Sequence, residues 1–333
     1  MPVTSLANER RDAPRQIPSQ RLARCHSYLV SETLSREELS RVVAIANGKG
    51  GVGKTSLTTT LSGLSAAAGY RVLLIDLDPQ GNAGEDLGYT GAQLGDNGAG
   101  LVSTLTTRGV LKPTIVNCRE RLDVVCGGEL LDDLAGLLLA RHHRGTDVAD
   151  VLVEPLSALL EAEDYDLVLI DCPPGEPNLQ LLALGVARWL LIPTRSDAAS
   201  LKGMSRIVQR LVDARSTNPD LELLGVALFD VPSTATRMRA DITKQIETAL
   251  GGVAPLFDTS IRHSVSATAA RGQGQLIHEY AEALEGEPFW KALREGRRPT
   301  SPGSAPALAG DYGALAHEIL LRINELEEPT DGT

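Results

Sequence analysis

A run of glycines and lysines near the start of the chain has the residue types and spacing of a phosphate-binding loop. It fits the pattern G-x-x-x-x-G-K-[ST] without a mismatch and consists of Gly48, Lys49, Gly50, Gly51, Val52, Gly53, Lys54 and Thr55. Glycines allow backbone N–H groups to turn towards phosphate oxygens. In such a loop Lys54 reaches the β- and γ-phosphates and the Thr55 hydroxyl binds Mg²⁺. We therefore expect a nucleotide site here, to which Ser56 also contributes.

The segments on either side have the character that such a loop requires. Residues 42–46 are a short apolar run, typical of a buried strand, and Leu57, Leu61 and Leu64 repeat at helical spacing after the loop. A helix that starts at the loop presents its partly positive N-terminus to a bound phosphate. The pattern predicts a strand–loop–helix unit that binds a nucleoside triphosphate.

Aspartates end two further apolar runs. Residues 72–75 lead into Asp76 and Asp78, which alternate and so point the same way, and residues 167–170 lead into Asp171. Open α/β sheets bind ligands at the carboxyl edge of their strands, so we expect the three carboxylates beside the phosphate loop. After a good phosphate loop, an apolar run that ends in aspartate indicates a Walker-B strand, whose carboxylate contacts Mg²⁺. Carboxylates that only cap their loops are the alternative.

Lys49 is a second lysine in a loop that needs only one. The segment from Lys49 to Thr55 resembles the deviant phosphate loop of the ParA/MinD family of ATPases, and the chain is most similar to the ParA (Soj-like) branch. In that family the early lysine completes a dimer that sandwiches two nucleotides. The resemblance therefore implies that Lys49 crosses to the nucleotide of the other subunit. A solvated loop lysine is the alternative.

The segment around Asp76 and Asp78 resembles the second motif of the same family. The resemblance implies that Asp78 orients the attacking water and that Asp76 supports Mg²⁺ together with Thr55 and Asp171. It thus implies ATP and Mg²⁺ as cofactors, with Lys49, Lys54 and Asp78 as the catalytic residues. The similarity covers residues 41–285 and the last helix.

Apolar runs alternate with helical patterns along most of the 333 residues. This predicts an α/β fold of the P-loop NTPase class, with a mostly parallel twisted sheet covered by helices on both faces. We expect an N-terminal arm and short helix at 1–40, the ATPase domain at 41–285, a linker rich in Pro, Gly and Ser at 286–310, and a C-terminal helix and tail at 311–333. The glycine-rich residues 83–113 are expected to be loops, and the last helix is expected to dock on the domain.

Composition favours a cytoplasmic protein. The four cysteines form no C-x-x-C pair, which is typical of a reducing compartment. No apolar run reaches the length of about 18–20 residues that a membrane helix needs. The C-terminal residues 325–333 are acidic and contain a proline, which disfavours a membrane-anchoring helix.

A net charge of −11 is not that of an obvious nucleic-acid binder. The resemblance nevertheless implies DNA contacts late in the chain, where the candidates are Arg237, Arg239, Lys244, Arg262 and Arg271. Each of them can equally be an ordinary solvated charge. Because dimerisation doubles the number of phosphate contacts, a weakly basic patch can suffice once ATP joins two copies.

The resemblance implies an ATP-dependent DNA partition protein, located on the nucleoid. Its ATP-bound homodimer would bind DNA non-specifically and hydrolyse ATP slowly, stimulated by a ParB-like partner. A related ATPase that positions another cargo, such as a conjugation, polar or division-site complex, without acting through DNA fits the same core. A scaffold in which hydrolysis hardly matters is a third possibility.

Overall fold

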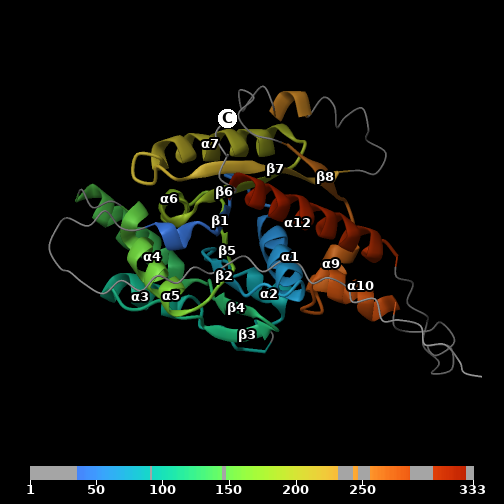
Figure 1. Ribbon diagram of the computed structural model, residues 1–333, viewed down its shortest axis with the longest axis horizontal. Coiled ribbons are helices and arrows are strands. Elements are labelled where there is room, and N and C mark those ends of the chain that lie inside the picture. The colour runs from blue at the N-terminus through green and yellow to red at the C-terminus, as the bar shows by residue number, and fades with distance from the viewer. Residues whose placement is uncertain are drawn as a thin grey trace, which may run out of the picture. The chain divides into compact units, whose positions relative to one another are not determined.

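The computed structural model describes residues 36–90, 92–144, 148–231, 243–246, 256–285 and 303–327, all within the unit Leu34–Thr333. An eight-stranded sheet runs through this part of the chain in the order β3-β4-β2-β5-β1-β6-β7-β8 (Figure 1). The strands are β1 (Val42–Ile45), β2 (Val72–Asp76), β3 (Ile115–Arg119), β4 (Leu122–Val125), β5 (Leu167–Asp171), β6 (Trp189–Thr194), β7 (Glu222–Val231) and β8 (Leu256–Arg262). Neighbouring strands are parallel except β3 and β4, which confirms the expected mostly parallel sheet.

Helices cover both faces of the sheet (Figure 1). One face carries α1 (Lys54–Ala67), α2 (Ala83–Leu87), α9 (Ser266–Arg271), α10 (Ile277–Glu285) and α12 (Ala305–Glu327). The other carries α3 (Ala99–Thr107), α4 (Leu130–His143), α5 (Val153–Ala162), α6 (Pro177–Val186) and α7 (Ala198–Ala214), with the 3₁₀ turns η1 (Glu37–Leu39) and η2 (Ala149–Leu152). Among these residues no helix combines the length and apolarity needed to cross a bilayer.

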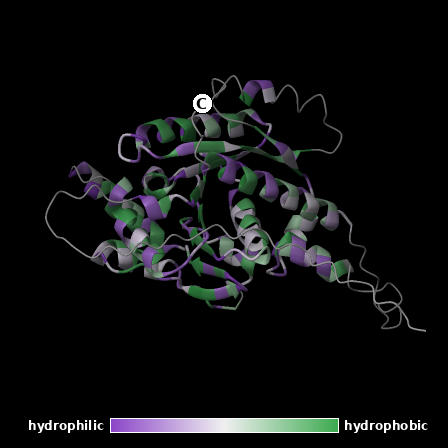
Figure 2. Cartoon of the chain, viewed as in Figure 1, coloured by the Kyte–Doolittle hydropathy of each residue, from purple (hydrophilic) through white to green (hydrophobic). Residues whose placement is uncertain are grey.

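The strands divide their side chains between two cores. In β1, Val42 and Ala44 face one core while Val43 and Ile45 face the other, because side chains alternate across a strand. The four central strands are therefore buried on both faces and read as continuous apolar runs. Figure 2 accordingly shows the strands mostly in the green of hydrophobic residues, whereas the helices alternate between green and purple.

Several boundaries differ from those expected. Residues 83–113 contain α2 and α3, because the glycines there end or begin short helices: Gly88 (φ +79°) follows α2 and Gly98 (φ +86°) precedes α3. The last helix starts at Ala305, inside the expected linker 286–310, because Pro306 is tolerated in a first helical turn. The sequence also predicts a helix at 236–250, of which the structure describes only residues 243–246.

The last helix docks on the domain, as expected. α12 lies beside α1 (Figure 1). Its side chains Leu308, Leu315 and Ile319 are buried in the core that α1 also covers. α12 also covers the edge strand β8. The Glu318 carboxylate accepts hydrogen bonds from the amides of Asp258 and Thr259 at 2.9 and 3.0 Å.

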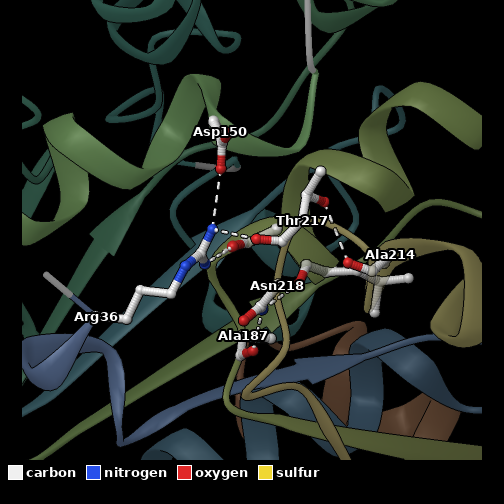
Figure 3. A network of polar contacts seen from close by, with 8 residues as sticks. Arg36, Asp150, Ala187, Ala214, Thr217 and Asn218 are labelled. Atoms are coloured by element: carbon white, nitrogen blue, oxygen red, sulfur yellow. Dashed lines mark hydrogen bonds and ion pairs between the residues drawn. The ribbon is translucent and has the colours of Figure 1, made fainter. Parts of the chain in front are cut away.

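At the amino edge of the sheet, Arg36 fixes the start of the described chain. Its guanidinium donates to the carbonyl of Gly185, to Asp150 Oδ1 at 2.9 Å and to the carbonyl of Thr217 at 3.3 Å (Figure 3). Asn218 donates to the carbonyls of Leu184 and Ala187, both at 2.7 Å. Together the two side chains satisfy carbonyls at the C-terminal end of α6 that have no partner within that helix.

Candidate functional site

The phosphate loop lies between β1 and α1, as the sequence predicts. Gly51 (φ +74°) and Gly53 (φ +90°) adopt the left-handed conformation that favours glycine, and α1 begins at Lys54. Gly48 N–H donates to the carbonyl of Gly203 in α7, 3.3 Å away. The loop is thus held at its start by α7 and at its end by α1, with Lys49, Gly50 and Gly51 exposed between them.

The two lysines of the loop have different surroundings. The Lys54 side chain is buried, at 5% exposure, and its ammonium donates to the carbonyl of Lys49 at 3.2 Å. Lys49 is exposed, and its ammonium has no hydrogen bond or ion pair with a residue that the structure describes. Lys54 therefore closes its own loop, while Lys49 is available to a ligand outside it.

Asn47 is a site residue that the sequence reading missed. It is fully buried at the end of β1, where its amide nitrogen donates to the carbonyl of Pro193 at 2.9 Å. Its side-chain oxygen accepts from the Lys49 amide, also at 2.9 Å. Asn47 thereby ties the backbone of Lys49 to β6. The only local signal for this role is a polar residue directly after a buried strand.

The three predicted carboxylates lie on neighbouring strands at the carboxyl edge of the sheet. Asp76 on β2 and Asp171 on β5 are direct partners in the parallel register, and both are fully buried. Asp78 follows β2; its amide donates to Asp76 Oδ1 at 2.8 Å, and its own Oδ1 accepts from the Gln80 amide at 2.9 Å. Because β5 also pairs with β1, the carboxylates come next to the phosphate loop.

Burial gives these groups unusual electrostatics. It raises the pKa of Asp171, against the opposing effects of the Thr55 hydroxyl and the Lys54 ammonium. It also raises the pKa of Asp76, and the nearby Asp171 charge adds to that rise. Burial lowers the pKa of Lys54, which the carboxylates of Asp171 and Asp78 oppose. Burial thus disfavours the charged forms of these three side chains, and a ligand of opposite charge would stabilise them.

A second polar cluster lies on the β6–β8 side of the loop. Arg195, directly after β6, donates to the carbonyl of Gly51 at 3.3 Å and forms an ion pair with Asp230 at the end of β7. The Asp230 carboxylate also contacts Nδ1 of His263, which follows β8. The sequence reading did not identify these three residues, which are far apart in the chain and meet only because their strands are adjacent.

The candidate DNA contacts are scattered. Arg237 and Arg239 lie outside the described residues, and Lys244 is exposed in the short helical stretch 243–246. Arg262 ends β8 and forms a bidentate ion pair with Asp311 of α12, at 2.6 and 2.7 Å, with its side chain 40% exposed. Arg271 is held by Asp86 of α2 at 2.5 Å. Arg262 and Arg271 are thus both engaged in contacts within the chain.

Comparisons with known proteins match most of the chain. The AAA domain family matches residues 40–223. The chain is 32% identical over 289 residues to the chromosome-partitioning ATPase Soj of Thermus thermophilus, a match that covers 86% of this chain and 97% of that protein.

Two solved structures have the same fold. An ATP complex of a McdA variant from Cyanothece matches with a TM-score of 0.64 and 21% identity over 84% of this chain and 96% of that one. Cobyrinic acid a,c-diamide synthase of Mycobacterium smegmatis with bound ADP and magnesium matches with a TM-score of 0.57 and 29% identity over 79% and 99%. With its phosphate loop and partnered aspartates in place, the chain belongs to the ParA/MinD family of P-loop ATPases.

Proposed function

We propose that this protein is an ATP-dependent DNA partition ATPase that works as a nucleotide-bound homodimer. The similarity to the Soj protein of Thermus thermophilus supports a partition role. The observation that carries the proposal is the outward exposure of Lys49 beside a phosphate loop that its own Lys54 already closes.

In this proposal Lys49 serves the second subunit. Its backbone is fixed by Asn47 at 2.9 Å, whereas its ammonium is unpaired within the described residues. The Lys49 ammonium extends from a backbone that is held in place, next to the exposed Gly50 and Gly51. It can therefore reach a phosphate of a nucleotide bound by a second subunit that approaches the carboxyl edge of the sheet. Each of the two nucleotides would then be held by Lys54 of one copy and Lys49 of the other.

The residues beside the loop fit a Mg²⁺ ion. Neither oxygen of Asp171 nor Oδ2 of Asp76 makes a hydrogen bond of normal geometry within the described part of the chain, and the Thr55 hydroxyl is close to Asp171. No three His, Cys, Asp or Glu side chains there form a ready metal site, as expected if phosphates and water supply most of the ligands. Thr55, Asp76 and Asp171 would hold the ion, which supplies positive charge against the triphosphate.

Asp78 is assigned to orient the attacking water. It is 5% exposed, its Oδ1 is occupied by the Gln80 amide, and its Oδ2 makes no hydrogen bond with a described residue. That oxygen can accept a hydrogen bond from water, while Lys54 and Lys49 stabilise the charge that develops on the phosphate. Hydrolysis would be slow until a ParB-like partner stimulates it.

DNA binding completes the proposal. A subset of Arg237, Arg239, Lys244, Arg262 and Arg271 would contact phosphates on nucleoid DNA. Each phosphate contact adds about one unit to the slope of log affinity against log salt concentration. Because two joined copies make twice as many contacts, they bind DNA much more tightly than one copy. The affinity for DNA would therefore follow the nucleotide state.

The deciding experiment compares DNA binding with ATP and with ADP at low salt. We expect the Asp78→Ala variant with ATP to bind non-specific duplex DNA, and the same variant with ADP to lose that affinity. If ATP adds no affinity, the protein is instead an ATPase that positions a cargo without DNA. Normal ATP turnover by Asp78→Ala would overturn the role of that carboxylate.

The dimer is tested separately by molar mass in solution. We expect Lys49→Ala to bind ATP but to stay monomeric, because the contribution to the other nucleotide is lost. Lys112→Ala removes an exposed lysine just before the edge strand β3, which β4, β2 and β5 separate from β1, and should dimerise normally. A Lys49→Ala protein that dimerises as well as this control would contradict the cross-subunit role.

A further inference from the structure

Arg271 connects elements that lie far apart in the sequence. It ends α9, and its Nε donates to Asp86 Oδ1 in α2 at 2.5 Å. Its Nη2 donates to the Ser56 hydroxyl in α1 at 3.3 Å, and its Nη1 lies 4.0 Å from Glu85 Oε2. One guanidinium thus contacts both the helix that begins at the phosphate loop and the short helix that follows the Asp78 segment.

Asp86 extends the connection into the phosphate loop. Its second oxygen, Oδ2, lies 3.0 Å from the Thr59 hydroxyl, which shares its one proton between that carboxylate and the carbonyl of Thr55, 2.9 Å away. Asp86 is 6% exposed, so these side chains supply hydrogen bonds that water cannot. A continuous set of hydrogen bonds therefore runs from Arg271 through Asp86 and Thr59 to Thr55, the last residue of the loop.

Backbone contacts hold the other side of α2. Gly88, directly after α2, packs against Gly274, where an added Cβ would lie 2.5 Å from the Gly88 Cα. Arg119 of β3 bridges the same junction, donating to the carbonyls of Leu87 and Gly274 at 3.2 and 3.1 Å. The segment after α9, which contains Gly274, thus packs against the end of α2. This packing limits how far Arg271 can move away from Asp86 and Ser56.

These contacts distinguish Arg271 from Arg262, another of the arginines considered above as DNA contacts. The Arg262 pair with Asp311 joins β8 to α12 and touches neither α1 nor α2. In Arg271 each of the three guanidinium nitrogens faces a partner within the chain. A DNA phosphate would have to compete with those partners.

We propose that Arg271 is a positioning residue for ATP hydrolysis. It fixes α2 against α1 and so sets the distance between the Asp78 oxygen and the phosphates held by the loop. The inference rests on the proposed role of Asp78. Α small misplacement of a reacting group can lower a rate by about a hundredfold, whereas binding of the triphosphate depends on the loop itself. Loss of Arg271 should therefore affect turnover and not affinity.

The test uses the full chain, without DNA or a protein partner. Single-turnover hydrolysis of bound ATP and the affinity for a fluorescent ATP analogue are measured for Arg271→Ala, Arg271→Lys and the control Arg188→Ala, which removes an ion pair with Glu222. We expect Arg271→Ala to hydrolyse ATP at least about tenfold more slowly with unchanged affinity. Arg271→Lys, which keeps the positive charge but not the planar guanidinium, should be intermediate, and Arg188→Ala should be normal.

Two results would overturn the proposal. They are normal hydrolysis by Arg271→Ala and a parallel loss of rate and affinity in that variant. Where Arg271→Ala does not fold, Arg271→Lys decides, because normal turnover by that variant rejects a positioning role. None of these readouts depends on DNA or on dimer formation through Lys49, so the partition proposal can fail while this one holds. Asp78→Ala shows separately whether the carboxylate acts at all.

Discussion

The phenyl ring of Phe229, near the end of β7, occupies the space that a Cβ atom on Gly53 would need. Such an atom would lie 2.2 Å from Cδ1 of Phe229, and Gly53 has a φ of +90°. The ring also meets Tyr312 of α12 edge-on, with centroids 6.0 Å apart. The last glycine of the phosphate loop is therefore required both by its backbone and by an aromatic side chain from another strand.

Gly53→Ala should weaken ATP binding by at least about tenfold, since the loop must move away from the ring to accept the new methyl group. Gly69→Ala is the control, because Gly69 has a φ of +100° but nothing within 4 Å of an added Cβ. It should cost about 1 kcal/mol of stability and leave ATP binding intact. Titration with a fluorescent ATP analogue measures both. Equal losses of affinity would show that the Phe229 contact is irrelevant.

Asp171→Asn should stabilise the protein that lacks nucleotide and metal. Burial raises the pKa of Asp171, so its charge disfavours the folded state when no cation is bound. Removing that charge should increase the free energy of unfolding by about 1–3 kcal/mol and abolish ATP turnover. Thermal unfolding without ligand gives the first value, with the exposed Asp164→Asn as control. A destabilised Asp171→Asn would mean that the Lys54 ammonium already compensates the carboxylate.

Glu279→Gln should destabilise the fold in a pH-dependent way. Burial alone would raise the pKa of Glu279, but hydrogen bonds from Arg119 and the Leu276 amide lower it below the ordinary 4.5. The ionised carboxylate is thus stabilising above pH 4.5, and its contribution is lost as the pH falls through the depressed pKa. We expect a difference of about 1–2 kcal/mol from the wild type at pH 7.

Urea unfolding over a series of pH values measures that difference, which should shrink once the pH is below 4.5. Glu282→Gln changes an exposed glutamate on the same helix and should show no such dependence. A gap that stayed constant with pH would mean that shape, and not charge, makes Glu279 important.

Arg36→Ala should lower the free energy of unfolding by about 2–3 kcal/mol, because it leaves the carbonyl of Gly185 and the carboxylate of Asp150 without the guanidinium (Figure 3). Arg36→Lys should recover only part of the lost stability, since an ammonium does not reproduce the planar set of N–H donors of a guanidinium. Urea unfolding is the measurement and the exposed Glu38→Ala is the control. An effect on ATP affinity without a loss of stability would contradict a purely structural role.

Sequence predicts the centre of this fold better than its margins. The apolar runs at 72–75 and 167–170, each with the aspartate that follows it, become β2 and β5, because a strand buried on both faces is a continuous apolar run. By contrast β3 has mostly partly exposed residues, and α2 is only five residues long. Their local patterns are too weak to distinguish them from loops, and packing against β4 and α1 decides their structure.

The site divides in the same way. Its phosphate loop and three aspartates follow local patterns, and the sheet brings them together as expected. Arg271 and Asp86 are 185 residues apart, and no local sequence pattern around either residue predicts that they pair. Phe229 and Asn47 likewise act through neighbours on other strands. Side chains that hold a site in place are recognised only once the strand order is known.

The carboxylates of α12 have a consequence for how copies of this protein meet. An uncovered edge strand invites another chain to add a strand to the sheet, a step that is hard to reverse. Since Glu318 already accepts the outward amides of Asp258 and Thr259, β8 has few donors left to offer a neighbour. Backbone pairing of β8 with a strand of another chain, which would lead to aggregation, is thereby disfavoured.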